Sequence, residues 1–255
     1  MILVSAASGA LGRLVIDRLS ARGDVVAVVR DPARAPRGVE VRRGDYDDPA
    51  GLREAFRGAD RLLLISSPEL DTGRRVRQHL DAVAAAVDAG VGAIAYTSFL
   101  GAGTEGAGVT EAHHATEKAI LGSGLPHTIL RHPYYGDAFV PDVSGGEVVG
   151  SGGGRSLNTA FRSDLAEAAA NVLTGDGHLG RAYDLTGPLW SHPGLAEELG
   201  LPYREAPDTG PGPMAWLNAL IRAGSLEHQS PDLERVLGRP AEPMADRVRR
   251  LMGRS

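Results

Sequence analysis

The sequence predicts an α/β fold, in which a doubly wound parallel sheet is joined to a small, mainly helical C-terminal lobe. Three observations support this prediction. Short apolar runs alternate with amphipathic stretches through the first two-thirds of the chain, a glycine-containing turn separates the first such pair, and prolines interrupt the chain from Ser191 onward. Short apolar strands separated by helices are typical of a parallel sheet that is covered on both faces. Closely spaced prolines favour several short helices.

The strands and helices follow from these runs in chain order. Seven apolar runs predict strands at Ile2–Val4, Val25–Val29, Val39–Val41, Leu62–Ile65, Ala93–Tyr96, Thr128–Leu130 and Ala182–Leu185. Five stretches of helical periodicity predict helices at Leu11–Leu19, Pro49–Phe56, Arg75–Ala89, Thr110–Leu121 and Ser163–Leu173. Right-handed crossovers between parallel strands then give the doubly wound arrangement.

Composition and charge exclude several classes of protein. The 255 residues contain no cysteine, which excludes disulfides, thiolate metal sites and a cysteine nucleophile. The formal net charge of −5 argues against a nucleic-acid-binding surface, and no apolar run approaches the roughly 20 residues that span a bilayer. Met1–Val4 begins a strand without a basic leader, so we expect no signal peptide. We therefore expect a cytoplasmic protein without nucleic-acid or membrane partners.

A turn of small residues joins the first strand to the first helix. Within the segment Val4–Gly12, residues Ala6–Gly12 match a pattern A-x-x-G-x-x-G, the dinucleotide-binding (Rossmann) fingerprint with alanine at its first glycine position. The second glycine lets the backbone approach a diphosphate, the third lets the helix pack closely, and the helix amides attract phosphate. We predict that a dinucleotide is bound by Ala6, Ser8, Gly9, Ala10, Leu11 and Gly12. An ordinary strand–helix turn is the alternative.

The end of the second strand favours NADPH over NADH. NAD sites usually place an acidic residue there, whereas this strand ends in Arg30. A guanidinium can bind the 2′-phosphate of NADPH through two hydrogen bonds. Two observations complicate this prediction: Lys118 is the only lysine among 27 basic residues, so many arginines must be surface residues, and Asp31 is adjacent.

Several segments resemble the NmrA-like type of atypical short-chain dehydrogenase/reductases, especially the NADPH-dependent quinone oxidoreductases. The resemblance covers most of the chain. The segments that carry it are Val29–Ala33, Gly44–Tyr46, Leu62–Ser67, Ala95–Ser98, Thr116–Lys118, Ser123–Arg131, Ser230–Glu234 and Gly238–Pro240.

The resemblance implies further cofactor contacts. Asp45 and Tyr46 would lie near the adenine, and Ser66 and Ser67 would line the diphosphate and the nicotinamide ribose. Otherwise Asp45 is a turn residue and the two serines end a strand. Residues 1–131, with 160–186 returning, would form the dinucleotide-binding core, and residues 132–159 and 187–255 the substrate-cleft lobe.

Many related reductases use a Tyr-x-x-x-Lys pair as an acid. Counting back from Gly124 places the lysine position at His113 and the tyrosine position at Val109, so this pair is absent. His113 is the candidate to contact the nicotinamide ribose or to donate a proton, because imidazole titrates near neutral pH. The alternative is a histidine on the helix surface. A metal site of His113, His114 and Glu117 lacks further ligands, and we expect no metal.

Aromatic residues are the candidates for binding a planar substrate. Tyr134 and Tyr135 follow the sixth strand, and Phe99 lies on a neighbouring loop. Each could stack on a flat molecule, but the tyrosines could equally be core residues. Trp216 is a weaker candidate, since a tryptophan on an amphipathic helix is more often part of a core.

The function that the sequence favours is an NADPH-dependent oxidoreductase. It would transfer a hydride to a quinone or a similar conjugated carbonyl small molecule. The alternative is a non-catalytic NADP(H)-sensing regulatory protein that acts through a protein partner, because the tyrosine acid is absent. An isomerase that keeps its cofactor is a third, weaker option. The sequence leaves the oligomeric state open, with a homodimer among the options.

Overall fold

The computed structural model describes residues 1–104, 106–207 and 213–253. The chain divides into two compact units, each with its own hydrophobic core. One of them, called the sheet unit below, comprises Met1–His132 and Leu165–Asp184. The other, called the lobe, comprises Pro133–Asp164 and Leu185–Ser255.

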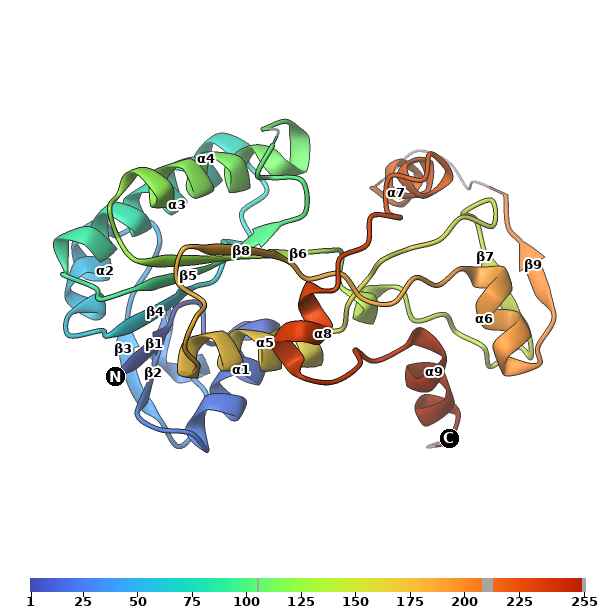
Figure 1. Cartoon of the computed structure of the whole chain (residues 1–255), viewed down its shortest axis with the longest axis horizontal. Helices are drawn as coiled ribbons and strands as arrows, with labels where there is room; N and C mark the ends of the chain where they lie inside the picture. The colour runs from blue at the N-terminus through green and yellow to red at the C-terminus, as the bar shows by residue number, and fades with distance from the viewer. Residues whose placement is uncertain (105, 208–212, 254–255) are drawn as a thin grey trace. The chain divides into compact units, whose positions relative to one another are not determined.

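A seven-stranded parallel sheet forms the centre of the sheet unit (Figure 1). Its strands are β1 (Ile2–Val4), β2 (Val25–Val29), β3 (Glu40–Arg43), β4 (Arg61–Leu64), β5 (Ile94–Phe99), β6 (His127–His132) and β8 (Arg181–Asp184). They lie in the order β3-β2-β1-β4-β5-β6-β8, and every neighbouring pair is parallel. This confirms the predicted doubly wound sheet. Its strand order reverses between β1 and β4, the place where such sheets bind dinucleotides beyond the carboxyl ends of the strands.

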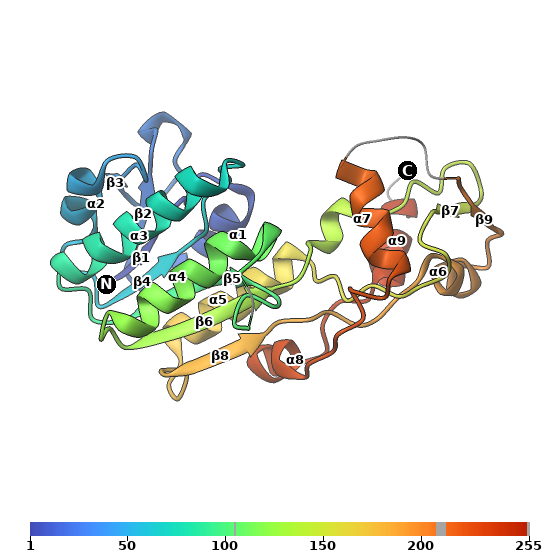
Figure 2. The same ribbon diagram turned by 90° about the horizontal axis from the view of Figure 1, so that it is seen from above.

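Five α-helices of the described chain cover the two faces of this sheet. They are α1 (Ala10–Ser20), α2 (Pro49–Phe56), α3 (Thr72–Asp88), α4 (Glu111–Gly122) and α5 (Arg162–Thr174). The helices α2, α3 and α4 lie on the face that is turned toward the viewer in Figure 2, and α1 and α5 lie on the other (Figure 1). Aspartate caps begin two of them: Asp48 accepts the Gly51 amide at 3.0 Å, and Asp71 accepts the Arg74 amide at 2.7 Å.

Burial explains why the central strands form. All five residues of β2 are buried, and Leu62, Leu63 and Leu64 of β4 are fully shielded from solvent. Each fully buried leucine stabilises the fold by about 1.5–3 kcal/mol relative to its exposed state. The edge strand β3 begins and ends later than the apolar run Val39–Val41 predicts. Its polar residues are held by backbone pairing with β2. A hydrophobic pattern in the sequence cannot predict such pairing.

The lobe contains the predicted short helices and two strands that the sequence does not predict. Its helices are α6 (His192–Leu199), α7 (Pro213–Arg222), α8 (Asp232–Leu237) and α9 (Met244–Met252). The strands β7 (Val148–Gly150) and β9 (Tyr203–Glu205) pair in parallel. With three residues each, they are too short to have a recognisable pattern, and they form through long-range pairing. Within the described ranges, no helix has both the length and the apolar composition that crossing a bilayer requires.

Candidate functional site

The turn between β1 and α1 leaves the amino end of α1 open. Gly9 is the N-cap residue, and it supplies no side-chain acceptor to the first turn of the helix. Gly9 and Ala10 are exposed and Ser8 is half-buried, whereas Leu11 is buried and can offer only its backbone amide. Amides at the start of a helix have no partner within the helix and carry partial positive charge. This turn therefore fits a diphosphate.

The two glycines of the turn have different structural roles. A Cβ atom on Gly12 would lie 2.6 Å from the Ala6 carbonyl oxygen and 2.7 Å from the Ala7 Cα atom. The helix can therefore approach the turn only when position 12 has no side chain. A Cβ atom on Gly9 would lie 3.2 Å from the same carbonyl oxygen, which is a tight but tolerable contact. Gly12 serves close packing, and Gly9 leaves room for a ligand.

Ala6, at the first position of the motif, has a left-handed backbone. Its φ is +47°, and among the described residues it is the one non-glycine residue with a positive φ. Its carbonyl oxygen accepts the Gly9 amide at 2.9 Å, which closes the turn. This conformation costs an L-residue about 1–2 kcal/mol. Strain of this kind is concentrated at ligand sites, where the surrounding structure enforces it.

Replacing Ala6 with glycine is expected to stabilise the protein by about 0.5 kcal/mol. Glycine removes the strain of about 1–2 kcal/mol but adds freedom to the unfolded chain, which costs about 0.4–1 kcal/mol. The matched control is Ala7→Gly, because Ala7 has no positive φ and should lose about 1 kcal/mol. Chemical denaturation of both variants measures the difference. Equal destabilisation by the two substitutions would contradict the strain at Ala6.

Arg30 is exposed at the end of β2, and its neighbour Asp31 turns away to cap a helix. The Asp31 carboxylate accepts the Ala33 amide at 3.0 Å at the start of the short 3-10 helix Pro32–Arg34. Arg30 makes no hydrogen bond or ion pair with any residue of the described ranges. Its charge contributes a little to lowering the pKa of Asp47, which hydrogen bonds from Arg74 and Gln78 lower more strongly. The guanidinium is thus available to an anionic ligand.

Arg13 is a further residue near the carboxyl ends of β1 and β2, and the sequence did not single it out. Its Nε atom donates to the Ser8 carbonyl oxygen at 3.0 Å, and its Nη2 atom donates to the Arg34 carbonyl oxygen. It therefore ties the turn between β1 and α1 to the segment after β2. Its place in the sequence, directly after Gly12, is the signal that could have revealed it.

The loop after β4 turns one of its two predicted site residues inward. The Ser67 hydroxyl donates to Gln78 Oε1 at 2.6 Å, and Ser67 is 4% exposed. Ser66 is half-buried, and its amide donates to Thr97 Oγ1 at 2.9 Å. The expected contact of the Ser67 side chain with a diphosphate is therefore not available in this arrangement, because the hydroxyl is bound to α3.

The two residues after β3 also have partners within the protein. The Tyr46 hydroxyl lies 2.7 Å from Ser5 Oγ and donates to the Ile65 carbonyl oxygen, and burial of this hydroxyl raises its pKa. Tyr46 thus links β3 to the ends of β1 and β4 instead of offering its hydroxyl to an adenine. The Asp45 carboxylate accepts the Asp47 amide at 3.2 Å, which is the turn role that the sequence left as the alternative.

His113 is buried, so it is not the surface histidine that the sequence left as an alternative. It is 3% exposed. Arg75 Nη2 donates to its Nε2 atom at 2.9 Å, and because a guanidinium only donates, the ring proton is on Nδ1, 2.9 Å from the Tyr96 hydroxyl. Burial, and then the charge of Arg75, lower the pKa of His113 to about 2. The imidazole is therefore neutral near pH 7, and this environment does not favour its expected role as a proton donor.

The other two residues of the metal site that the sequence argues against, His114 and Glu117, hold neighbouring segments. His114 Nδ1 lies 2.7 Å from the Ala102 carbonyl oxygen. Glu117 is buried and forms two hydrogen bonds with Arg131, at 2.8 and 3.0 Å, and it accepts a third from Ser98. Both side chains thus have structural roles at the carboxyl ends of β5 and β6.

Three buried histidines are expected to make the protein sensitive to acid. Burial lowers the pKa of His79 and of His132 to about 3 and that of His113 to about 2, whereas a histidine in the unfolded chain titrates near 6.5. Between these values the unfolded state binds more protons. The contribution of the neutral histidines to the free energy of unfolding is therefore fully present above about pH 6.5. Below this pH the free energy of unfolding falls by about 1.4 kcal/mol per pH unit for each histidine.

Calorimetric Tm values measured from about pH 8 to about pH 4.5 test this expectation. The Tm should be level above about pH 6.5 and should drop steeply below it. His79→Gln removes one titrating group. In this variant the free energy of unfolding should fall less steeply below about pH 6.5, by about 1.4 kcal/mol per pH unit. A Tm that stays constant down to about pH 4.5 would be inconsistent with neutral buried histidines.

The three aromatic residues predicted for the substrate belong to different units. In the sheet unit, Phe99 lies with its ring 5.9 Å from that of His113. In the lobe, Tyr134 packs against the hydrophobic core beside Phe139, with 6.3 Å between ring centres, and Arg162 covers the Tyr135 ring at 4.3 Å. Tyr134 is therefore partly a core residue.

Trp216 differs from the expectation that it is a core residue. It lies on α7 in the lobe, and half of its surface is exposed. Its neighbour Leu217 and Ile221, one turn later, are buried instead and hold α7 in the core of the lobe.

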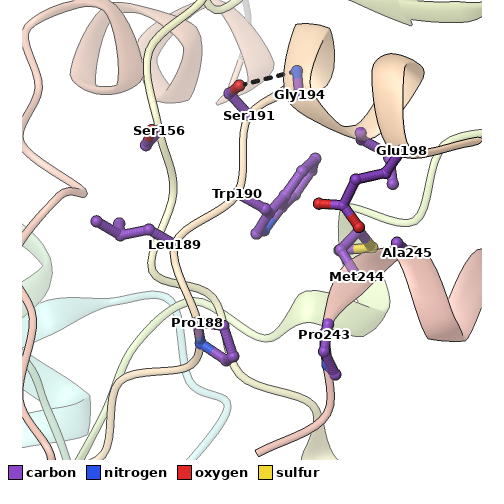
Figure 3. Close-up of a pocket in the computed structure, with 11 residues that line it drawn as sticks. Ser156, Pro188, Leu189, Trp190, Ser191, Gly194, Glu198, Pro243, Met244 and Ala245 are labelled. Atoms are coloured by element: carbon purple, nitrogen blue, oxygen red, sulfur yellow. Dashed lines mark hydrogen bonds between the residues drawn. The ribbon is translucent and has the colours of Figure 1, made fainter.

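The lobe contains a pocket of about 200 Å³ beside Trp190 (Figure 3). Its polar lining comprises Ser156, Ser191 and Glu198, and Ser191 already accepts the Gly194 amide at 3.2 Å. None of the residues that the sequence predicts for cofactor or substrate lines this pocket. We therefore assign it no part in the candidate site.

The sequence matches known reductases over most of its length. Residues 6–176 match a family described as NAD(P)H-binding. Quinone oxidoreductase 2 of Escherichia coli is 39% identical over 211 residues, which are 78% of this chain and 73% of that protein. A (4-alkanoyl-5-oxo-2,5-dihydrofuran-3-yl)methyl phosphate reductase of Streptomyces griseus is 31% identical over 96% of both chains.

Solved structures agree with these sequence matches. Triphenylmethane reductase of Citrobacter sp., complexed with NADP(H), has a TM-score of 0.89 at 33% identity and covers 98% of this chain and 99% of its own. The NADPH complex of the Escherichia coli quinone oxidoreductase has a TM-score of 0.85 at 32% identity, with coverage of 99% and 100%. These findings confirm the resemblance and the Rossmann-type fold inferred from the sequence, and the family match confirms a nicotinamide dinucleotide as the cofactor.

Proposed function

The chain belongs to the NAD(P)H-binding family, and on this premise we propose that it is an NADPH-dependent oxidoreductase whose acceptor is a quinone or a similar conjugated carbonyl compound. The observation that carries the proposal is a pair of available groups at the carboxyl ends of the neighbouring strands β1 and β2. The open amino end of α1 suits a diphosphate, and the exposed Arg30 at the end of β2 suits the 2′-phosphate that NADPH has and NADH lacks.

The protein's own task in such a reaction is positioning. When bound, NADPH supplies a hydride from its nicotinamide ring. The residues Ala6–Gly12, called the phosphate turn below, hold the diphosphate, and Arg30 and Arg13 flank the segment where the adenosine ribose would lie. Holding the donor and the acceptor side by side makes the hydride transfer effectively unimolecular. One hydride and one proton from water convert a quinone to its hydroquinone, which is a two-electron reduction.

A conjugated acceptor suits a site without a tyrosine acid. Val109 stands at the tyrosine position of the related reductases, and His113 is neutral with both ring nitrogens engaged. The reduced product must therefore persist as an anion until water protonates it. Hydroquinone and enolate anions are stabilised by conjugation, whereas a simple alkoxide is not. We propose Phe99, next to His113, as the residue of the sheet unit that stacks on the flat acceptor.

The names of the relatives support the same class of substrate. Quinones, acylated dihydrofuranones and triphenylmethane dyes all contain a conjugated π system. All three relatives are oxidoreductases or reductases by name, so we do not favour the non-catalytic sensor. The lobe is our proposal for the part that shapes the substrate cleft.

Consumption of NADPH, followed by its absorbance, tests the proposal with a panel of benzoquinones, naphthoquinones, conjugated enones and triphenylmethane dyes. Unconjugated ketones are the matched control. We expect turnover of one or more conjugated classes and none of the unconjugated ketones. Tight NADPH binding without turnover of any acceptor would overturn the proposal and would favour the sensor.

A further inference from the structure

Three successive amides after β4 are held by side chains from three different parts of the sheet unit. The sheet ladder ends at Leu64, so these amides need other acceptors. The pairs are Ile65 N to Ser5 Oγ at 2.8 Å, Ser66 N to Thr97 Oγ1 at 2.9 Å, and Ser67 N to His79 Nε2 at 2.8 Å. This loop therefore has no amide left to donate to a ligand at these three positions.

His79 can accept the Ser67 amide in only one form. It lies on α3 and is fully shielded from solvent. A backbone amide only donates, so Nε2 must carry no proton, and the ring proton is on Nδ1, 2.9 Å from Thr116 Oγ1. Thr116 in turn donates to the Ala112 carbonyl oxygen at 2.6 Å. Each of these three hydrogen bonds thus has only one possible donor. The tautomer and the orientation of the His79 ring are therefore fixed.

The hydrogen bond from the Ser67 amide to His79 also sets the direction of the Ser66 carbonyl group, because both belong to the peptide bond between Ser66 and Ser67. It is trans, so its C=O group points away from its N–H group. Because the Ser67 N–H points toward His79, the Ser66 carbonyl points away from α3. This carbonyl accepts no hydrogen bond from the described part of the chain. Unlike an amide, a free carbonyl oxygen cannot bind a phosphate, but it can accept a hydrogen bond from a hydroxyl group.

The strand order indicates which hydroxyl that would be. The neighbouring strands β2, β1 and β4 carry Arg30, the phosphate turn and the Ile65–Ser67 loop at their carboxyl ends. A dinucleotide whose 2′-phosphate lies at Arg30 and whose diphosphate lies on α1 would place its second ribose over the loop after β4. This is the ribose of the nicotinamide half.

We propose that His79 is a positioning residue: it holds the Ser66–Ser67 peptide so that the Ser66 carbonyl oxygen accepts a hydrogen bond from a hydroxyl of the nicotinamide ribose. The proposal rests on the proposed function, because it requires NADPH binding. It assigns a cofactor role to a histidine that would not itself touch the cofactor.

The test compares two variants with two ligands in calorimetric titrations. His79→Leu removes the acceptor for the Ser67 amide, whereas His79→Gln keeps an acceptor oxygen and an N–H donor at similar positions. NADPH contains both ribose units, and adenosine 2′,5′-bisphosphate contains only the adenosine half. We expect His79→Leu to weaken NADPH binding by about tenfold and to leave the affinity for the bisphosphate within about twofold. His79→Gln should restore most of the NADPH affinity.

The two ligands separate the possible results. Unchanged NADPH affinity in His79→Leu would overturn the proposal, as would equal weakening of both ligands, which indicates general distortion. If His79→Leu does not fold, Thr97→Val takes its place, because it removes the acceptor of the Ser66 amide in the same loop. This variant should also lose affinity for NADPH and not for the bisphosphate. Equal losses of both affinities would again overturn the proposal. Failure of the wild-type protein to bind NADPH would instead refute the proposed function.

Discussion

Gly9→Asp is expected to reduce the affinity for NADPH by two to three orders of magnitude while leaving the fold as stable as the wild type. Aspartate is a favourable N-cap residue, and Gly9 supplies no side-chain cap, so the helix loses nothing. The new carboxylate would occupy the amino end of α1, where the diphosphate is expected. Two unit charges about 4 Å apart near a protein surface repel each other by about 4 kcal/mol.

Gly9→Asn is the matched control for this substitution. Asparagine caps a helix about as well as aspartate and has nearly the same size but no charge, so it should weaken NADPH binding much less. Calorimetric titration gives the affinities, and the Tm of each variant reports the fold. If Gly9→Asp binds NADPH as tightly as the wild type does, the diphosphate does not lie at the amino end of α1.

Arg30→Ala is expected to weaken NADPH binding by about 10- to 150-fold and to change NADH binding by less than about twofold. A hydrogen bond to a charged group contributes about 1.5–3 kcal/mol, and only NADPH carries the 2′-phosphate that would receive it. Because Arg30 forms no ion pair in the described ranges, its removal leaves no buried charge without a partner.

Arg37→Ala is the matched control for Arg30→Ala. Arg37 is exposed on the same segment after β2, so this variant removes one positive charge without removing the predicted contact. Its effect on NADPH should stay within about twofold, since an exposed charge that makes no contact with the ligand is screened by salt. Equal losses for NADPH and NADH in Arg30→Ala would mean that Arg30 does not recognise the 2′-phosphate.

Local patterns in the sequence predicted the sheet and the glycine-containing turn between β1 and α1. The apolar runs identify β1 and β2 with the observed bounds, because strands buried on both faces need continuous hydrophobic residues. The spacing of Gly9 and Gly12 identifies the start of α1, since both positions depend on neighbours within a few residues.

Side-chain directions after β3 and β4 could not be predicted in this way. Whether Ser67 faces a ligand or α3 depends on Gln78, which lies 11 residues away in sequence, and the Tyr46 hydroxyl reaches across the sheet to Ser5. The same holds for His113. Its position on an amphipathic helix leaves the surface and the interior open, and its neutral state follows from burial next to Arg75, which lies on another helix.

Paired calorimetric titrations of the wild-type protein with NADPH and with NADH test the cofactor assignment most directly. We predict saturable binding of both dinucleotides, with NADPH bound at least about tenfold more tightly because Arg30 recognises its extra phosphate. Binding of neither dinucleotide, or tighter binding of NADH than of NADPH, would contradict this assignment.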